Sequence, residues 1–448
     1  MNTPAITRSS GARLLSLGFA VGISLGFGVN KGWAGTGAMP GLDTPPVDFW
    51  SRSHLTGNWG GTRDELDRDG VDFSVVYINE VLGNPSGGNF GRGVIDAGLL
   101  NVGLDLDLEK LGGWKGASFH ANGLWIHGDS LTRQDVGDYS VLSSIDAYNT
   151  ARLDELWLQQ TFLDGKISLR AGQLAVDTEF FSTTYGALFI NATFGAFPLV
   201  ANDFQKFSSP TYPLASPAMR LKLRPVDCFY AQTAVFDGDA GTQPGNNRGV
   251  RIDFHGATGV LIFSEIGYLL NQGRDDHGLP GTYKMGSWVH TADFPTWISQ
   301  ADLANGTGPL RGSGVNYGIY GGIDQVAWQS GDEQLAFFLR AGTSPAEASQ
   351  VDFYLDGGIN LTGFIPGRKN DVFGLALARS AFSHEFSDAS VAQGGPAFRD
   401  EVIVEGTYDI ALAPWWNLQP DLQYVFSAGG TTSSPDALVI GLRSTVSF

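Results

Sequence analysis

The chain has one cysteine, Cys228, and few charged residues for its length of 448. A single cysteine cannot form a disulfide within the chain, and its expected role is that of a small apolar residue in a strand. Charged residues make up 17% of the sequence, below the ~25% of soluble domains. Glycine is abundant instead, at 61 residues, nearly twice its usual share of ~7%. This composition indicates a protein of many strands and turns.

Long apolar runs are also scarce, since only the amino terminus has one. Two arginines precede an apolar run at 14–29, and Gly32-Trp33-Ala34 follows as a small-x-small site. Residues 1–34 are therefore predicted to be a secretory signal peptide. Its removal takes away three basic residues and no acid, so the net charge falls from −18 to −21, which argues against nucleic-acid binding. No later segment has the roughly 20 consecutive apolar residues of a membrane helix.

Chemical motifs are equally scarce. The seven histidines show no close zinc-ligand spacing, and His384-Glu385 lacks the second histidine of an H-E-x-x-H motif. No phosphate-binding loop or dinucleotide fingerprint occurs. Acidic neighbours such as Asp105 and Asp107 could form a glycosidase pair, but a solvated strand face explains them more simply. We therefore expect no metal, no cofactor and no enzyme activity.

The rest of the chain reads as one β domain. Residues 35–70 are predicted to be an N-terminal linker with a short charged periplasmic helix at 63–68. Residues 71–448 then show strand-like alternation to the end. The expected fold is all-β, an antiparallel transmembrane β-barrel of about 16 strands of the outer-membrane kind. The predicted strands are 71–83, 94–108, 116–127, 151–162, 166–176, 218–224, 228–236, 258–270, 281–292, 314–328, 334–342, 350–362, 371–379, 401–412, 416–426 and 436–448.

The links between these runs tend to alternate between short and long, as the periplasmic turns and outer loops of a barrel do. The link 271–280 is an exception, because it is long where the scheme requires a short one. The link 177–217 is the longest and holds many phenylalanines. We expect it to fold partly into the lumen, where those rings are buried, although an extracellular cap is an alternative.

The last strand and the aromatic residues favour a barrel in a membrane. Leu438, Ile440 and Leu442 share one face of the last strand, with Arg443 on the other, and the chain ends in Phe448. Aromatic residues gather near the ends of runs, where membrane-interface girdles would need them. They include Tyr77, Trp114, Trp125, Trp328, Trp415, Trp416 and Tyr424.

The hairpin at 151–176 is the clearest local signal. Asp164-Gly165 joins two alternating runs and predicts a tight two-residue turn. Counting outward pairs Gln159 with Arg170 and Trp157 with Gly172 on a polar face that also holds Glu155. The opposite face carries Leu156, Leu158 and Phe162 and is expected to meet lipid. On the polar face, Trp157 is expected either to stack on a sugar ring or to cover Gly172 as part of the wall.

The sequence resembles the carbohydrate-selective porin family, the OprB type, over nearly all of the mature chain. The matching pieces include Leu55–Arg63, Glu80–Asn84, Ser86–Gly88, Asp177–Phe180, Leu188–Asn191, Phe194–Gly195, Tyr212–Ala215 and Leu418–Tyr424. The resemblance implies a sixteen-stranded channel in the outer membrane of a Gram-negative bacterium that passes small sugars down their gradient. Expected partners are small sugars and the lipid and lipopolysaccharide of that membrane, with the oligomeric state left open.

Strand residues of both signs are expected to line the pore constriction and bind sugar. They are Glu155, Trp157, Gln159, Arg170, Arg220, Arg340, Glu405 and Asp409. Mixed signs suit neutral polyhydroxylated solutes, whereas an anion pore should be lined by rings of arginine and lysine. A general or anion-preferring porin is the first alternative, and an outer-membrane lipase or glycosidase is the second.

Overall fold

The computed structural model describes residues 48–205, 207–241, 248–250, 258–273, 276–297, 302, 304–306 and 313–448. The predicted signal peptide and most of the linker lie outside these residues. The described strands are β1 (Val71–Ser86), β2 (Val94–Asp107), β3 (Ala117–Gly128), β4 (Thr150–Phe162), β5 (Ile167–Leu174), β6 (Ser216–Val226), β7 (Phe229–Asp237), β8 (Val260–Leu270), β9 (Gly281–Pro295), β10 (Ser313–Ser330), β11 (Glu333–Thr343), β12 (Val351–Thr362), β13 (Val372–Phe382), β14 (Glu401–Ala413), β15 (Trp416–Phe426) and β16 (Ala437–Ser447).

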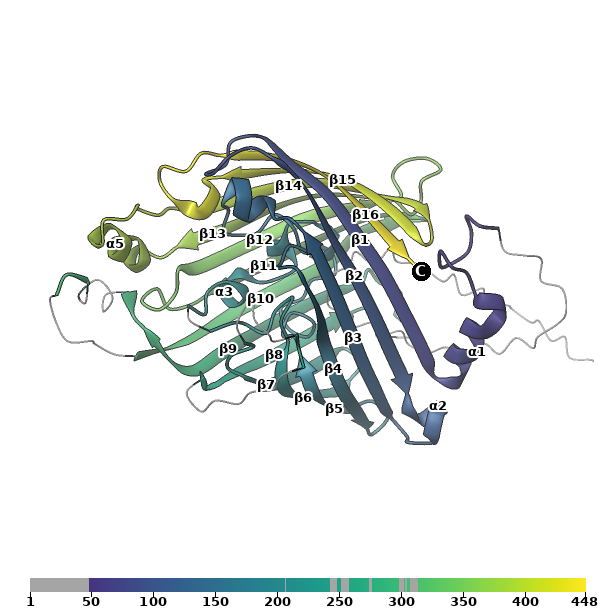
Figure 1. Cartoon of the computed structure of the whole chain (residues 1–448). Coiled ribbons are helices and arrows are strands. Elements are labelled where there is room, and N and C mark those ends of the chain that lie inside the picture. The colour runs from purple at the N-terminus through teal and green to yellow at the C-terminus, as the bar shows by residue number, and fades with distance from the viewer. Residues whose placement is uncertain are drawn as a thin grey trace, which may run out of the picture.

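These sixteen strands of the described chain form one closed antiparallel barrel, which confirms the predicted fold (Figure 1). Each strand pairs with its neighbours in sequence, and β1 closes the ring by pairing with β16. Closure leaves no strand edge without hydrogen-bond partners, which a lipid environment requires. The ten-residue link between β8 and β9 is present as the sequence suggested, with positions 274 and 275 outside the described residues.

Side-chain alternation sets the two faces of the barrel. On β16, Ile440 and Leu442 are exposed on the outside, whereas Val439 and Arg443 are buried on the inside. Leu156, Leu158 and Phe162 of β4 are likewise exposed. A strand with period two therefore presents apolar side chains to lipid and polar ones to the lumen.

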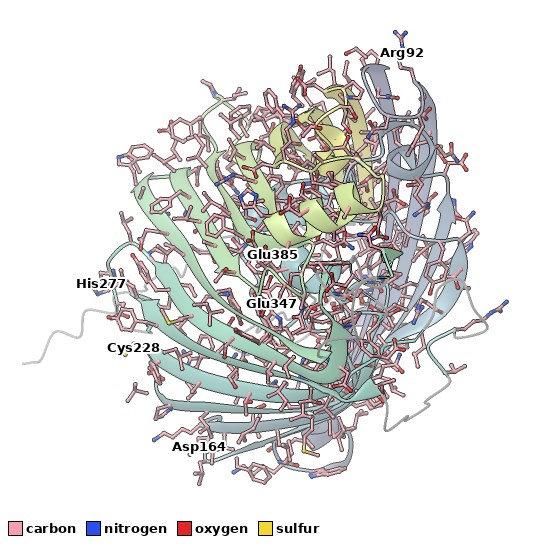
Figure 2. The ribbon with its side chains drawn as sticks, turned by 90° about the vertical axis from the view of Figure 1, so that its left-hand side faces the viewer. Arg92, Asp164, Cys228, His277, Glu347 and Glu385 are labelled. Carbon is pink, nitrogen blue, oxygen red and sulfur yellow. The ribbon has the colours of Figure 1, made fainter. Side chains whose placement is uncertain are left out.

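The two ends of the barrel differ. Helices α1 (Thr62–Asp69) and α2 (Leu108–Gly112) lie near the C-terminus at the end of short turns, and α5 (His384–Ala392) lies at the other end (Figure 1). Figure 2 views the molecule from the side that carries α5, on which Glu385 is labelled. α1 occupies the position of the charged helix expected at 63–68. By the porin pattern, the end with α1 and α2 faces the periplasm and the end with α5 faces outward.

Most of the remaining helical segments belong to the long loops. The loop segments are α3 (Pro198–Ala201), the 3-10 turns η3 (Gly186–Leu188), η4 (Ala192–Phe194) and η6 (Ala428–Gly430), and the π turn η2 (Thr132–Val136). The 3-10 turn η1 (Trp59–Gly61) directly precedes α1. Among the described residues, no helix has the length and apolar character needed to span a bilayer.

The segment 175–215 joins β5 to β6 and packs inside the ring of strands; we call it the inner loop. Its rings Phe181, Phe194 and Phe197 are fully buried against inward-facing wall residues. Phe197 lies edge-on to Tyr354 of β12, with ring centroids 5.0 Å apart. Phe194 lies edge-on to Phe338 of β11, with ring centroids 6.2 Å apart. The main apolar core therefore lies between this loop and the inner wall.

Four of the aromatic residues named as girdle candidates are exposed in the described structure: Trp114, Trp125, Trp328 and Tyr424. Trp125 and Trp328 are exposed on the outside of the barrel. Trp415 differs, because it is buried: its ring stacks on Trp50 at 5.9 Å, and its Nε1 donates to the carbonyl oxygen of Phe49 at 3.1 Å. Trp415 thus attaches the segment before α1 to the barrel instead of contributing to a girdle.

Candidate functional site

The β4–β5 hairpin has the register that its sequence predicts. Gln159 pairs with Arg170 and Trp157 pairs with Gly172, around a turn at Asp164-Gly165 where both residues have positive φ. Gly172 has a φ of 149°, and a Cβ there would lie 2.2 Å from the carbonyl oxygen of Leu156. Only glycine lets the two strands approach so closely at this point.

A row of polar side chains crosses the inner wall on β4, β5 and β6. Arg170 pairs with Gln159 on one side and with Arg220 on the other. Gln159 Oε1 accepts from Arg170 Nη2 at 3.0 Å and from Arg220 Nη2 at 2.9 Å. The hairpin and β6 therefore bring together three of the predicted site residues.

Glu179 of the inner loop balances the charge of the two arginines. Its Oε1 lies 2.5 Å from Arg170 Nη1 and 3.3 Å from Arg220 Nη2. Burial alone would raise the pKa of Glu179, but Arg170 and Arg220 outweigh burial and hold this pKa below its ordinary value. Glu179 is thus ionised at neutral pH and joins the loop to the wall.

Trp157 lies between two neighbours. The guanidinium carbon of Arg170 is 3.6 Å from the centroid of the ring, and the His120 ring stacks on Trp157 with centroids 5.0 Å apart. His120 is held in turn by Asp105, whose Oδ1 is 2.7 Å from Nδ1. Both faces of Trp157 are therefore covered, so a sugar could stack on this ring only after a neighbour moved.

Glu155 binds the inner loop at its first residues. One carboxylate oxygen accepts from the backbone nitrogen of Ala175 at 2.9 Å and from Thr178 Oγ1 at 3.2 Å. The side chain is 4% exposed. Glu155 therefore fixes the start of the loop next to the Trp157–Arg170 row.

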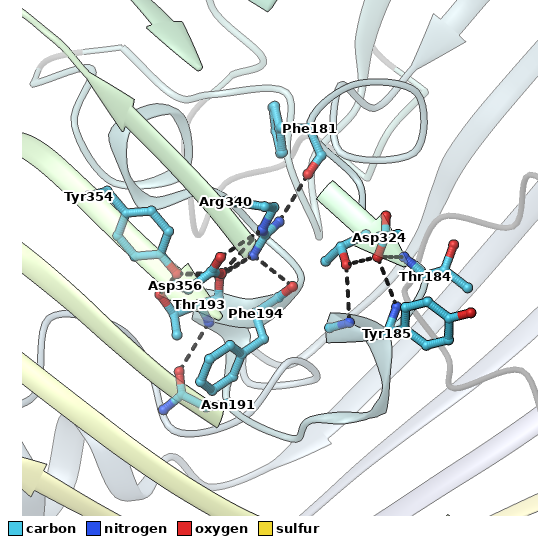
Figure 3. Close-up of polar contacts among 12 residues, drawn as sticks. Phe181, Thr184, Tyr185, Asn191, Thr193, Phe194, Asp324, Arg340, Tyr354 and Asp356 are labelled. Atoms are coloured by element: carbon cyan, nitrogen blue, oxygen red, sulfur yellow. Dashed lines mark hydrogen bonds and ion pairs between the residues drawn. The ribbon is translucent and has the colours of Figure 1, made fainter. Parts of the chain in front are cut away.

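Arg340 and Glu405 bind the same loop on other strands. Arg340 of β11 donates from Nη1 to the carbonyl oxygen of Phe181 at 3.0 Å and from Nη2 to that of Phe194 at 2.8 Å, and it forms an ion pair with Asp356 of β12 (Figure 3). Glu405 of β14 accepts from the backbone nitrogens of Ile190 at 2.6 Å and Asn191 at 3.0 Å.

Further inward-facing acids, which the sequence did not single out, complete these attachments. Asp324 of β10 accepts from Thr184 N at 3.0 Å and from Tyr185 N at 3.3 Å (Figure 3). Glu265 of β8 accepts from Phe181 N at 3.1 Å. The inward side of each strand's alternation could have revealed these acids, but nothing local indicates which loop amides they bind.

Asp409 lies apart from these contacts. Its two carboxylate oxygens accept from Asn417 Nδ2 at 2.9 and 2.8 Å, across the β14–β15 pair near its turn. Among the described residues, no hydrogen bond or ion pair joins the Asp409 side chain to the inner loop or to the Arg170 row. The eight predicted residues therefore fall into a row on β4–β6, a set of loop attachments and one separate wall position.

The wall facing Glu179 is basic. Lys222 of β6 places its Nζ 4.6 Å above the Tyr230 ring, and Lys284 of β9 donates to the carbonyl oxygen of Ser182 at 2.7 Å. Together with Arg170 and Arg220 they line one side of the lumen. In the described part of the chain, no group of three or more His, Cys, Asp or Glu side chains is arranged to hold a metal ion.

Comparison with known proteins agrees with this geometry. The model of the carbohydrate-selective porin, OprB family, matches residues 91–448. The chain is 25% identical over 419 residues to Porin B of Pseudomonas aeruginosa, covering 87% of this chain and 90% of Porin B. It is 23% identical over 431 residues to the putative porin QuiX of Acinetobacter baylyi, covering 90% and 95% respectively. The high-pH structure of Pseudomonas putida OprB has the same fold, with a TM-score of 0.82 at 24% identity over 90% of this chain and 100% of that one.

Proposed function

The chain belongs to the carbohydrate-selective porin family, OprB type, and from that premise we propose that it selects small sugars where the inner loop meets the wall of β4–β6. It is a sugar-preferring channel in the outer membrane of a Gram-negative bacterium. Transport through it is passive diffusion down the gradient of monosaccharides and similar solutes. Outward-facing side chains contact the lipid and lipopolysaccharide of that membrane.

The observation that carries this proposal is the row formed by Gln159, Arg170 and Arg220 with Glu179 opposite. It offers donors and acceptors of both signs side by side, which is what the hydroxyl groups of a neutral sugar require. The Arg170 side chain keeps 13% of its surface exposed, whereas Arg220 keeps 3%. Arg170 is therefore the arginine that a passing solute reaches, and Arg220 holds Gln159 and Glu179 in place.

The other predicted residues shape the constriction without the same access to solute. Trp157 supports the Arg170 guanidinium from beneath. Glu155, Arg340 and Glu405 hold the inner loop inside the barrel through its backbone. Asp409 contributes charge to the lumen toward the periplasmic end. Binding at such a site stays weak, with a dissociation constant near ~1 mM, because tight binding would clog the channel.

An anion-preferring pore is the second candidate, and one observation favours it. Arg170, Arg220, Lys222 and Lys284 project from β5, β6 and β9 toward the same side of the lumen. Their field would attract anions if Glu179 did not offset it. The reversal potential of the channel in a KCl gradient distinguishes the sugar-selective pore from the anion-preferring pore. A sugar-selective pore is expected to discriminate weakly between K⁺ and Cl⁻, whereas an anion-preferring pore should favour Cl⁻.

The experiment compares Arg170→Ala with Arg379→Ala in planar bilayers while glucose is titrated. Arg379 lies on the outer face of β13, where it is paired with Asp400, so its loss should leave sugar block unchanged. Removing Arg170 should raise the glucose concentration for half-block about five-fold, the effect of one or two weak hydrogen bonds. If both variants keep the wild-type half-blocking concentration, the β4–β6 row is only part of the barrel wall, and sugar is selected elsewhere in the channel.

We further propose that the protein has no catalytic activity. The family is one of channels, which supports this part of the proposal. Hydrolysis of nitrophenyl glycosides or esters by the purified barrel, abolished by a lumen substitution, would contradict this part of the proposal.

A further inference from the structure

A second cavity lies away from the Arg170 row, between the inner loop and the segment 129–149 that joins β3 to β4. Its volume is about 390 Å³, within the range of roughly 300–1,000 Å³ typical of small-molecule sites. Its lining includes Arg133, Asp146, Asp177, Phe207, Ser209 and Tyr212. Segment 129–149 joins its strands at the end that carries α5, so this cavity is nearer the outside than the β4–β6 row. We call it the vestibule.

Two polar atoms in the vestibule have no protein partner. Ser209 is 6% exposed, and its Oγ makes no hydrogen bond within the described structure. Asp177 accepts from the backbone nitrogen of Tyr212 at 3.1 Å through Oδ2, but its Oδ1 is buried without a partner. Burying a polar atom without a hydrogen-bond partner is unfavourable, so these atoms indicate a place where water or a ligand hydroxyl binds.

The charge of the vestibule argues against an ionic ligand. Arg133 is the one basic residue among the described lining residues of the vestibule. Its Nη1 lies 3.0 Å from Asp146 Oδ1, so its charge is paired. Arg133 is further engaged by the carbonyl oxygen of Ala147 at 3.1 Å. Asp177 has a pKa raised to about 7, because burial and the charge of Glu155 outweigh the hydrogen bond from Tyr212. With Arg133 paired to Asp146 and Asp177 only partly ionised at neutral pH, the vestibule carries little net charge.

Apolar and polar groups share the remaining lining. Phe207 stacks on His290 with centroids 5.1 Å apart and borders the vestibule together with Phe189 and Ala196. Tyr212 is held by a hydrogen bond from its hydroxyl to the carbonyl oxygen of Ile145 at 2.9 Å. A pyranose has C–H faces that suit aromatic rings and a rim of hydroxyl groups that suits Asp177 and Ser209.

We propose that the vestibule is a separate outer binding site for a neutral sugar, which holds the solute before it reaches the β4–β6 row. The proposal rests on the sugar-channel function above and adds a second site to it. Ser209 Oγ and Asp177 Oδ1 accept from ring hydroxyls, and the Phe207 side supplies the apolar surface. Sugar from outside reaches this site directly, whereas sugar from the periplasm must first pass the narrow region.

The test measures glucose block in bilayers with sugar added to one chamber at a time. Orientation is established with the native Cys228, which is exposed at the short β6–β7 turn, by labelling reconstituted protein with a membrane-impermeant maleimide. For Asp177→Asn with Ser209→Ala, we expect the half-blocking concentration to rise about five-fold for glucose added outside, and to change less than two-fold for glucose added at the Cys228 side. The control Asp164→Asn with Ser264→Ala alters a turn tip and a lipid-facing residue, and it should match the wild type.

The outcomes separate the two proposals. Wild-type channels that glucose never blocks from either side would overturn the sugar-channel function itself. If the double variant keeps the wild-type half-blocking concentration for glucose added outside, the vestibule proposal alone is overturned. The same follows if the half-blocking concentration rises equally for glucose added on either side. If the double variant does not fold, Ser209→Ala by itself is expected to raise the outer half-blocking concentration about two-fold, and no change in that variant would equally overturn the vestibule.

Discussion

Arg340→Met tests whether the inner loop is held from within the wall. The substitution leaves Asp356, which is 0% exposed, without its ion pair, and it leaves the carbonyl oxygens of Phe181 and Phe194 without the donor that Arg340 supplies. The carbonyl oxygen of Thr193 also loses Arg340 but keeps the hydroxyl of Tyr354. Breaking one partner of a buried pair costs about 3–5 kcal/mol, mostly because the remaining charge is uncompensated. Asp356→Asn combined with Arg340→Met should recover much of this cost, because no buried charge remains.

Two measurements follow from this reasoning. Urea unfolding in lipid vesicles, monitored by tryptophan fluorescence, should show the loss of about 3–5 kcal/mol in Arg340→Met and a smaller loss in the double variant. Single-channel conductance should rise in both variants, because the loop is released on one side. The matched control is Arg379→Met, which removes an exposed ion pair with Asp400 and should cost about 0–1 kcal/mol. If Arg340→Met behaves like Arg379→Met in both measurements, the loop does not depend on this attachment.

Three further predictions concern the barrel face, the loop and pH. Ile440→Arg places a charge on an outward position that is 53% exposed, so it should destabilise the barrel in lipid by about 2–4 kcal/mol if the position lies near the midplane. Equal folding of Ile440→Arg and Ile440→Ala in lipid would contradict the assignment of faces. Deleting residues 188–199 removes the centre of the inner loop and should increase conductance, whereas unchanged conductance would place that segment outside the pore. Arg170 and Arg220 stabilise the Glu179 carboxylate, so its contribution to sugar block should persist as the pH falls to 5 and be lost only below 4.5, the ordinary pKa of a glutamate. Sugar block that weakens between pH 7 and 5 in the wild type but not in Glu179→Gln would contradict this, whereas weakening in both would assign the titration to another group.

The strands could be predicted because the information for them is local. Alternation on β16 separates Ile440 and Leu442 from Arg443, and Asp164-Gly165 marks a turn that fixes the Gln159–Arg170 pair. Each of these features depends on residues close together in sequence. The register of a hairpin follows directly from the length and residues of its turn.

The contacts of the inner loop could not be predicted in the same way. Arg340 binds a carbonyl oxygen 159 positions away, and Glu405 binds an amide 215 positions away. No periodicity connects such residues, and a carboxylate that binds backbone nitrogen looks in sequence like one that faces water. Glu179 was missed as a site residue for this reason, although Asp177–Phe180 carried the family resemblance.

Trp157 shows what an isolated hairpin leaves out. The β4–β5 pairing predicted correctly that its ring lies on the lumen side with Arg170. The neighbouring pair of His120 with Trp157 belongs to the next strand, β3, and it brings the second ring that covers the indole. The sequence left two roles open for Trp157, stacking on a sugar or covering Gly172 in the wall. With His120 stacked on the ring and the Arg170 guanidinium above it, the indole supports the arginine.

The most direct test of the sugar channel is a glucose titration on single wild-type channels in a planar bilayer. We expect the current to be blocked in steps, with half-block near ~1 mM and little discrimination between K⁺ and Cl⁻ in a salt gradient. A conductance that glucose does not change, together with a strong preference for Cl⁻, would contradict the account and identify the basic wall of β5, β6 and β9 as an anion path.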